Sequence, residues 1–392
     1  MDEMIRLFGG SMMSPVPDPY PVYARLRAES PVMHFEGPLG PCTMFTRYGD
    51  VLAALKDAAT FSSKGNARGI GLVMGRTILE MDGQEHLRQR RIVTPAFSPR
   101  ALRSGLEEVV VRTVNQLIDE FAGDGRAELV QQFTFTFPLR VIAHVLGIPI
   151  SDFHQFHHWA LDLLAISDDP MKGLEAAQKI VDYLRPILEE RRREPREDLV
   201  STLLHTEVEG ERLTEEEVLG FLRLLLPAGA ETTYRLTGSL IFALLSHPAV
   251  LEEVRADRTV LPLAIEETLR WESAVQYVSR ETAVDTEVAG VALPAGTLLM
   301  LAIGSANRDE TRFARPDSFE PRREDVSAHL AFGFGEHFCL GSNLARLEAT
   351  AALTALLDRL PNLRFEPGKA STIVGMAFRS PDHLPVLFDP GR

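Results

Sequence analysis

The sequence predicts a mainly α-helical protein that folds as a single domain with a small β portion. Three observations lead to this prediction. Helical periodicity dominates from about residue 100 to residue 246. Short strand-like runs are confined to stretches near 32–46 and 287–301, with a few more near the C-terminus. Glycine and proline are spread throughout the 392 residues, so no linker divides the chain.

Within this single domain, residues 1–392, four stretches are expected to differ in structure. About residues 1–60 should be richer in strands, and about 80–275 should form the helical body. A small β region should follow at about 276–302, where Leu293-Pro294-Ala295-Gly296 is typical of a turn between strands. The fourth stretch, 329–341, is a glycine-rich loop.

Composition excludes several classes of function. The chain is 45% hydrophobic with a formal net charge of -14, which argues against nucleic-acid binding and against attachment to an anionic membrane. Its two cysteines, Cys42 and Cys339, make a poor disulfide framework and favour a cytoplasmic location. No secretory signal and no apolar run of about 18 residues is present, so we expect no membrane anchor.

One predicted helix is unusually long and apolar nearly all round. Thr214 and Glu217 form a capping box, and the pattern continues until His247-Pro248 stops it. Midway, Pro227 predicts a kink, and Glu231 and Thr232 place an acid and a hydroxyl among apolar residues. A plain structural alternative stays open, in which Glu231 pairs with a distant arginine and Thr232 bonds back to a helix carbonyl.

Other charged residues occur at spacings that allow shared sites. His86 and Arg90 lie four apart on a helix opening near Gln84, and with Arg280 and His337 they could clamp a ligand bearing two carboxylates. The alternative for each is a solvated or internally satisfied side chain. Glu267 and Arg270, three apart, could form a buried ion pair or an ordinary surface pair.

Histidines at 154 and 158 have the i, i+4 spacing of zinc ligands. Because no third ligand is fixed by spacing, a plain helical face is the better interpretation.

Cys339 lies in the glycine-rich loop His329-Leu330-Ala331-Phe332-Gly333-Phe334-Gly335-Glu336-His337-Phe338-Cys339-Leu340-Gly341. The glycines allow tight turns and close approach of a flat ligand. A helical pattern starts at Ser342, so backbone N–H groups should favour a thiolate. Such a thiolate can be the axial ligand of a haem iron, whereas a lone cysteine is otherwise most often a buried structural residue.

Together these motifs resemble the cytochrome P-450 family of haem-thiolate monooxygenases in its soluble bacterial form. The loop at 332–341 matches the haem-binding loop at every defining position, and residues 228–233 match the oxygen-activation segment of the central helix. The pair Glu267 and Arg270 and the pair His86 and Arg90 also match. So do the stretches Ala306-Asn307-Arg308-Asp309 and Phe319-Glu320-Pro321. Pro227 departs from the pattern, where a small aliphatic residue is expected.

The resemblance implies a role for each matched residue. Cys339 would be the thiolate ligand of haem b, and Glu231 and Thr232 the acid–alcohol pair of oxygen activation. Glu267, Arg270 and Arg323 would be structural. The haem would be contacted by the following residues: His86, Arg90, Arg280, His337, the weaker candidate His329, Phe332, Gly341 and Ala228.

The resemblance further implies a substrate and partners. The substrate would be a lipophilic small molecule (steroid, terpenoid or fatty-acid-like), oxygenated with O₂ in a pocket drawing on Ile70, Leu72, Val73, Leu225 and Val275. Electrons would come from a separate ferredoxin or flavodoxin with its NAD(P)H-dependent reductase, docking at Arg88, Arg91 and Arg346 of a monomer. An H₂O₂-dependent peroxygenase and a non-catalytic haem-thiolate sensor or carrier are the alternatives.

Overall fold

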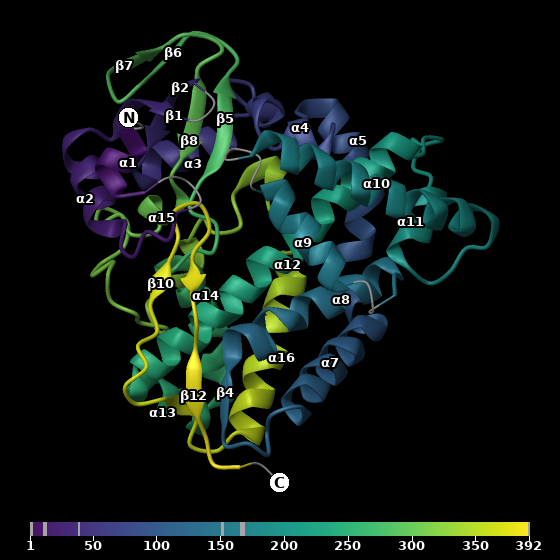
Figure 1. The fold of residues 1–392 in the computed structure, drawn as a ribbon. Coiled ribbons are helices and arrows are strands. Elements are labelled where there is room, and N and C mark those ends of the chain that lie inside the picture. The colour runs from purple at the N-terminus through teal and green to yellow at the C-terminus, as the bar shows by residue number, and fades with distance from the viewer. Residues whose placement is uncertain (1–2, 11–13, 38–39, 150–152, 165–168, 391–392) are drawn as a thin grey trace.

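The structure is a computed structural model that describes residues 3–10, 14–37, 40–149, 153–164 and 169–390. Helices make up most of it, and the central helix α12 (Glu215–Ser246) crosses the middle of the molecule (Figure 1). The strands lie in two groups, one beside the N-terminus and one lower in the view, toward the C-terminus (Figure 1). This arrangement agrees with the mainly α prediction.

The longer helices occur in the following order: α2 (Tyr20–Glu29), α3 (Tyr48–Lys56), α5 (Gly83–Val93), α7 (Glu107–Asp119), α8 (Thr136–Leu146), α9 (Phe153–Leu164), α10 (Pro170–Arg193), α11 (Leu199–His205), α12, α13 (Pro248–Ala256), α14 (Leu261–Trp271) and α16 (Ser342–Arg359). The short helices are α1 (Glu3–Phe8), α4 (Gly71–Met74), α6 (Pro99–Ala101) and α15 (Ile303–Ala306). Because α1, α2 and α3 occupy much of the first 60 residues, that stretch is more helical than predicted.

The main sheet has five strands in the order β1-β2-β8-β5-β3. These strands are β1 (Val32–Gly37), β2 (Gly40–Phe45), β3 (Phe61–Ser62), β5 (Val278–Thr282) and β8 (Leu298–Leu301). Strand β2 runs parallel to β8, and the other neighbours are antiparallel. The sheet therefore joins the N-terminal stretch to the β region after α14.

Smaller sheets complete the β portion. They consist of β6 (Thr286–Val288) with β7 (Val291–Leu293), of β4 (Arg126–Glu128), β12 (Pro385–Leu387) and β9 (Arg364–Phe365), and of β10 (Ile373–Val374) with β11 (Ser380–Pro381). The predicted turn at 293–296 lies between β7 and β8, with Gly296 at φ +83°. Since β7 and β8 belong to different sheets, this turn redirects the chain rather than closing a hairpin.

Helix α12 is central because apolar side chains cover almost all of it. Its capping box forms as predicted, with Thr214 Oγ1 accepting from Glu217 N–H and Glu217 Oε2 accepting from Thr214 N–H. Its first half packs in one core cluster with α8 and α10, and its second half in another with α7 and α16. The helix runs through Pro227 without a break. None of the described helices is long and apolar enough to cross a membrane.

Candidate functional site

The loop before α16 presents Cys339 at its end. Cys339 keeps accessible surface although many protein atoms surround its sulfur, and its backbone N–H donates to the Phe332 carbonyl at 2.9 Å, which closes the loop. Gly333 and Gly335 have φ of +69° and +73°, a conformation that favours glycine. A Cβ at Gly335 would lie 2.8 Å from the Leu55 carbonyl oxygen. The glycines therefore fix the turn that positions the sulfur.

The electrostatic balance at Cys339 differs from the sequence-based expectation. Removal from water raises the pKa of the thiol, whereas the backbone N–H groups of Gly341 and Ser342 and the charge of Arg90 act to lower it. Because desolvation is the largest of these effects, the position before α16 does not by itself favour the thiolate. We expect coordination to a metal to be what removes the proton.

The structure brings together four predicted cationic residues from three separate parts of the chain. His86 and Arg90 come from α5, Arg280 from β5, and His337 from the cysteine loop. The His86 and His337 rings lie 4.1 Å apart between centroids. Arg90 donates to the Phe338 carbonyl, next to Cys339. We call these four residues the cation cluster.

Among the described residues, two members of the cation cluster, Arg280 and His86, are only partly compensated. Arg280 is 5% exposed, and no carboxylate lies within ion-pair distance of it among the described residues, although Asp82 and Glu336 are near enough to influence its pKa. His86 Nε2 is buried and has no hydrogen-bond partner in the described part of the chain. Burial, followed by the charges of Arg280 and His86, lowers the pKa of His337 to about 3. Buried donors of this kind fit a ligand with two carboxylates, such as the propionates of haem b.

His329 lies outside this cluster. Its Nε2 is 3.0 Å from Glu266 Oε2, and Arg346 holds the same carboxylate through two bonds of 2.6 and 2.8 Å. Burial raises the pKa of Glu266, but the hydrogen bonds from Arg346 and His329 outweigh it and bring the pKa to about 2. Glu266 thus connects the start of the cysteine loop to α16. It occupies Nε2 of His329, the residue that was the weaker candidate for a haem contact.

The middle of α12 opens onto unfilled space. Ala228 is exposed and Thr232 half-buried, although most other positions of the helix are buried. Thr232 Oγ1 donates to the Ala228 carbonyl at 2.8 Å. Glu231 is 1% exposed and its Oε2 lies 3.3 Å from Nη2 of Arg235. These contacts match the structural alternative, in which Glu231 pairs with an arginine and Thr232 bonds back to a helix carbonyl. The difference is that the arginine is on the same helix rather than distant in sequence. Burial raises the pKa of Glu231, against the opposing charge of Arg235.

The cysteine loop packs on both core clusters of the helical body. Leu340, just after Cys339, packs on the core cluster that contains the first half of α12. Phe332, at the other end of the loop, packs on the cluster that contains the second half. The two sides of Cys339 therefore pack on the two core clusters that also hold the two halves of α12, and α12 and α16 lie side by side in Figure 1.

The predicted pocket residues divide into three environments. Val73 and Leu225 are buried in one core cluster, on which Ile70 also packs. Leu72, on α4, is 58% exposed and so contributes to the surface rather than to an enclosed wall. Val275 forms an isolated β-bridge with Phe378, which belongs to the chain just before β11.

Glu267 and Arg270 form a fully buried pair rather than a surface pair. Arg270 contacts both oxygens of Glu267 at 2.8 Å and donates to the carbonyls of Asn307 and Pro316. Arg323 lies in the same network, with its Nε 2.9 Å from Glu267 Oε2. These residues hold the chain segment between α15 and the cysteine loop.

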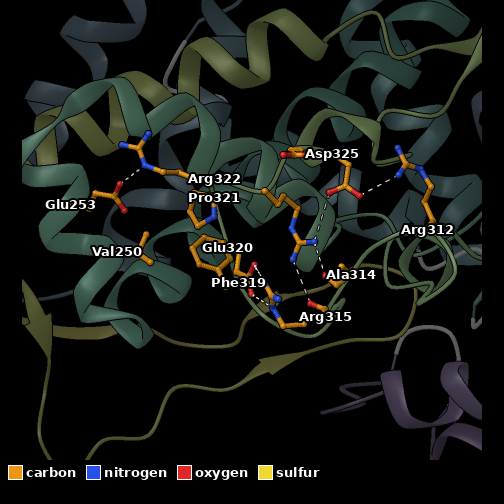
Figure 2. Close-up of a pocket in the computed structure, with 12 residues that line it drawn as sticks. Val250, Glu253, Arg312, Ala314, Arg315, Phe319, Glu320, Pro321, Arg322 and Asp325 are labelled. Atoms are coloured by element: carbon orange, nitrogen blue, oxygen red, sulfur yellow. Dashed lines mark hydrogen bonds and ion pairs between the residues drawn. The ribbon is translucent and has the colours of Figure 1, made fainter.

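A surface pocket of about 770 Å³ lies on the outside of this network (Figure 2). Figure 2 shows that its charged residues pair with one another, as Arg315 does with Glu320 at 2.7 Å and Arg312 with Asp325 at 3.2 Å. It includes Arg323 but not Cys339 or the cation cluster. This pocket is therefore separate from the candidate site.

Three residues of the site were missed by sequence reasoning. Arg235 could have been found from its i, i+4 spacing to Glu231. Glu266 gave no signal beside its neighbour Glu267. Ser63, whose Oγ is 2.9 Å from His337 Nε2, is brought in by the fold alone.

The zinc interpretation gains no support. The side chain of His154 lies outside the described residues. Among the described residues, the grouping with metal-ligand geometry is His86, Glu336 and His337, which overlaps the cation cluster.

Comparisons with known proteins place the chain in a family. A sequence model described as Cytochrome P450 matches residues 139–371. Cytochrome P450 109 of Bacillus spizizenii is 39% identical over 349 residues, which is 87% of this chain and 84% of that protein. The structure of CYP109Q5 from Chondromyces apiculatus has a TM-score of 0.85 and 37% identity, covering 96% of each chain. That of CYP109E1 from Bacillus megaterium with testosterone has a TM-score of 0.85 and 32% identity, covering 95% of this chain and 99% of the other.

These matches extend over nearly the whole chain. The chain belongs to the cytochrome P450 family and is a haem b monooxygenase.

Proposed function

We propose that Cys339 Sγ ligates the haem iron and that the cation cluster holds the two haem propionates. The observation that supports this proposal is the loop that presents Cys339 beside the cation cluster, in which the buried His86 Nε2 has no hydrogen-bond partner among the described residues. The missing side chain of Gly341, whose Cβ would lie 3.9 Å from the sulfur, keeps space free next to Sγ. Phe332 and Ala228 would contact the two faces of the ring.

When bound, haem b supplies the iron centre at which O₂ is reduced by two electrons and one oxygen atom is inserted into the substrate. The chain's own residues manage the protons. Thr232 Oγ1, which is half-buried at the opening, carries a hydroxyl proton that it can donate once its bond to the Ala228 carbonyl is released. Glu231, with its raised pKa, can take up protons and return them toward Thr232.

Replacing Thr232 tests its proposed role in proton delivery. In Thr232→Ala, we expect reductant to be consumed while product per electron pair falls at least about tenfold and hydrogen peroxide takes its place. Thr233→Val is the matched control, because Thr233 is the adjacent buried residue on α12. Tight coupling in Thr232→Ala, measured as product per NAD(P)H, would contradict the role of Thr232.

The proposed substrate is a lipophilic molecule of steroid or terpenoid type. The half-buried Ile70 and Val275 supply apolar surface, and the similar CYP109E1 was solved with testosterone. A panel of testosterone, a cyclic terpene and a long-chain fatty acid can be titrated while the haem Soret band is followed. The proposal expects saturable shifts with the steroid or terpene, and a shift confined to the fatty acid would overturn it.

For electron delivery, we propose docking of an acidic ferredoxin or flavodoxin at Arg88, Arg91 and Arg346. Each already has a carboxylate partner in the chain: Glu217 for Arg88, Glu209 for Arg91 and Glu266 for Arg346. A partner's acids must therefore compete with these glutamates, which makes Arg91, 49% exposed and paired at 3.3 Å, the most available.

Charge reversal tests the docking proposal. Arg91→Glu should slow first-electron transfer and flatten its salt dependence, because an attractive pair becomes repulsive. The control Arg364→Glu makes the same change at an exposed position of β9, in another part of the surface. Equal reduction rates and salt slopes in Arg91→Glu and wild type would exclude Arg91 from the docking surface.

A further inference from the structure

Arg235 links the buried acid of α12, Glu231, to the antiparallel pair β10 and β11, which we call the C-terminal hairpin. Its Nη2 lies 3.3 Å from Glu231 Oε2, and its Nη1 donates to Ser380 Oγ at 3.2 Å. Ser380 is the first residue of β11, which contacts α12 along this stretch. The guanidinium is therefore held from two sides, by the acid on its own helix and by a hydroxyl from a segment 145 residues away.

The surroundings of Arg235 restrict its orientation. Its Cζ lies 4.7 Å from the Tyr234 ring centroid and 5.5 Å from that of Phe378. The Arg235 side chain is 16% exposed and that of Glu231 2%. Charges paired with so little water interact more strongly than a surface pair would. The planar guanidinium is thus placed by two rings and two hydrogen bonds rather than by solvent.

Ser380 is a firm anchor because the residue before it is immobilised. Arg379 is 2% exposed and donates to Glu272 Oε1 at 2.6 Å. It also donates to the carbonyls of Val16 at 2.9 Å and Gly375 at 2.7 Å. A buried arginine with these partners fixes the backbone on which the Ser380 hydroxyl is mounted.

The same segment forms the wall that carries Val275. Phe378 is bridged to Val275, and the Arg379 N–H donates to the Ala274 carbonyl at 3.0 Å. On the other side, the Phe378 ring lies near the Arg235 guanidinium. The chain from Phe378 to Ser380 therefore touches a candidate substrate wall and, through Arg235, the buried acid.

We propose that Arg235 is the positioning residue for the Glu231 carboxylate, and that Ser380 and Phe378 of the C-terminal hairpin set its orientation. This inference rests on the proposed function, in which Glu231 supplies protons toward Thr232. Arg235 acts on the reaction through Glu231, by holding the acid in one place and favouring its ionised form. Arg235 and Tyr234 are charged or titratable groups that act on Glu231.

The first readout is the protonation of Glu231 in the resting haem-loaded protein, without reductant. The carboxyl C=O band of protonated Glu231 can be assigned in the infrared spectrum by its loss in Glu231→Gln. In Arg235→Gln the band should grow at neutral pH, because burial still raises the pKa of Glu231 while the opposing positive charge is gone. Ser380→Ala and Phe378→Ala should change the band less than Arg235→Gln does.

Arg140→Gln is the matched control. Arg140, on α8, is 23% exposed, close to the 16% of Arg235, and it pairs with Glu120 rather than with Glu231. Its substitution should leave the Glu231 band unchanged. In turnover, Arg235→Gln should lower product per electron pair by about tenfold, within the range of general acid catalysis, and Arg140→Gln should not.

The outcomes separate this inference from the proposed function. An unchanged Glu231 band in Arg235→Gln, or an equal change in Arg140→Gln, would overturn the positioning role even if Glu231→Gln is uncoupled. Full coupling in Glu231→Gln would instead remove Glu231 from proton delivery and with it the basis of the proposal. Growth of the band with loss of coupling in Arg235→Gln alone supports it.

Discussion

Arg280 and His86 are buried members of the cation cluster whose polarity the described residues do not fully compensate. Arg280 donates to the Ser279 carbonyl at 2.8 Å and has no carboxylate at ion-pair distance among the described residues. A buried cation in this state lowers stability unless a ligand neutralises it. The cation cluster is therefore better explained as a ligand site than as part of the core.

Removing the Arg280 charge should weaken haem retention. A hydrogen bond to a charged group contributes about 1.5–3 kcal/mol, so haem loss from Arg280→Gln should be about ten- to a hundredfold faster than from wild type. Transfer of haem to apomyoglobin measures this rate. Arg140→Gln serves again as the control, and identical transfer rates in Arg280→Gln and wild type would remove Arg280 from the propionate site.

Glu348 on α16 predicts a pH dependence of stability. The residue is 2% exposed, its Oε2 has no hydrogen-bond partner in the described structure, and burial raises its pKa well above the ordinary 4.5. The folded protein therefore keeps Glu348 protonated at pH values where the unfolded chain ionises it. Its contribution to stability should fall as the pH rises above 4.5.

The variant Glu348→Gln removes this titration. Relative to wild type, its free energy of unfolding should increase with pH above 4.5, by up to about 1.4 kcal/mol per pH unit, and the difference should be constant at lower pH. Denaturant unfolding of the haem-loaded proteins across pH measures it. Parallel pH curves for the two proteins would show that Glu348 does not change its protonation on unfolding.

At the scale of elements, α12 combines two tasks. Its structural task is met by a capping box at Thr214 and by apolar packing of both halves. Its middle carries Ala228, Glu231 and Thr232 at an opening. The contacts of Glu231 and Thr232 alone do not distinguish structure from function. The exposure of Ala228 within a buried helix favours a functional role for this segment, because a purely structural helix would be covered by other side chains there.

The C-terminal hairpin depends on a glycine that brings its two segments together. Gly375 has φ +119°, and a Cβ there would lie 1.9 Å from the Phe378 carbonyl oxygen. Gly368 has φ +82° but nothing within 4 Å of its Cβ position. A side chain at Gly368 would therefore meet backbone strain alone, whereas a side chain at Gly375 would meet both backbone strain and a steric clash.

Alanine at these two positions should have different costs. Gly368→Ala should lose about 1–2 kcal/mol of unfolding free energy from the left-handed backbone. Gly375→Ala should lose more, because it also displaces the backbone before Ser380 and thereby the anchor of Arg235. Chemical denaturation measures both values. Equal losses in the two variants would mean that the hairpin accommodates the side chain and that its geometry is not fixed as described.

At the scale of the whole molecule, the sequence was most informative where local patterns determine structure. The Thr214 cap, the length of α12 and the start of α16 follow from capping and periodicity, and the structure confirms them. The helices within the first 60 residues and the assignment of β7 and β8 to different sheets depend on long-range packing, which periodicity does not encode.

The residues of the candidate site also differ in whether the sequence alone could identify them. Cys339, Glu231 and Glu267 could be chosen because motifs mark them. The contact of His329 with Glu266, and of Ser63 with His337, could not, since each joins residues far apart in sequence. The pKa of Cys339 was also mispredicted, because desolvation outweighs the backbone N–H groups whose presence the sequence indicates.

The central claim is that Cys339 ligates the haem iron through its sulfur. The most direct measurement is the absorbance spectrum of the reduced, carbon monoxide-bound protein, compared between Cys339→Ser and Cys42→Ala. The chain has no other cysteines than these two, and Cys42 is buried in β2. We predict that Cys42→Ala keeps the red-shifted Soret band of a thiolate-ligated haem and that Cys339→Ser loses it. A thiolate Soret band that persists in Cys339→Ser would contradict the account.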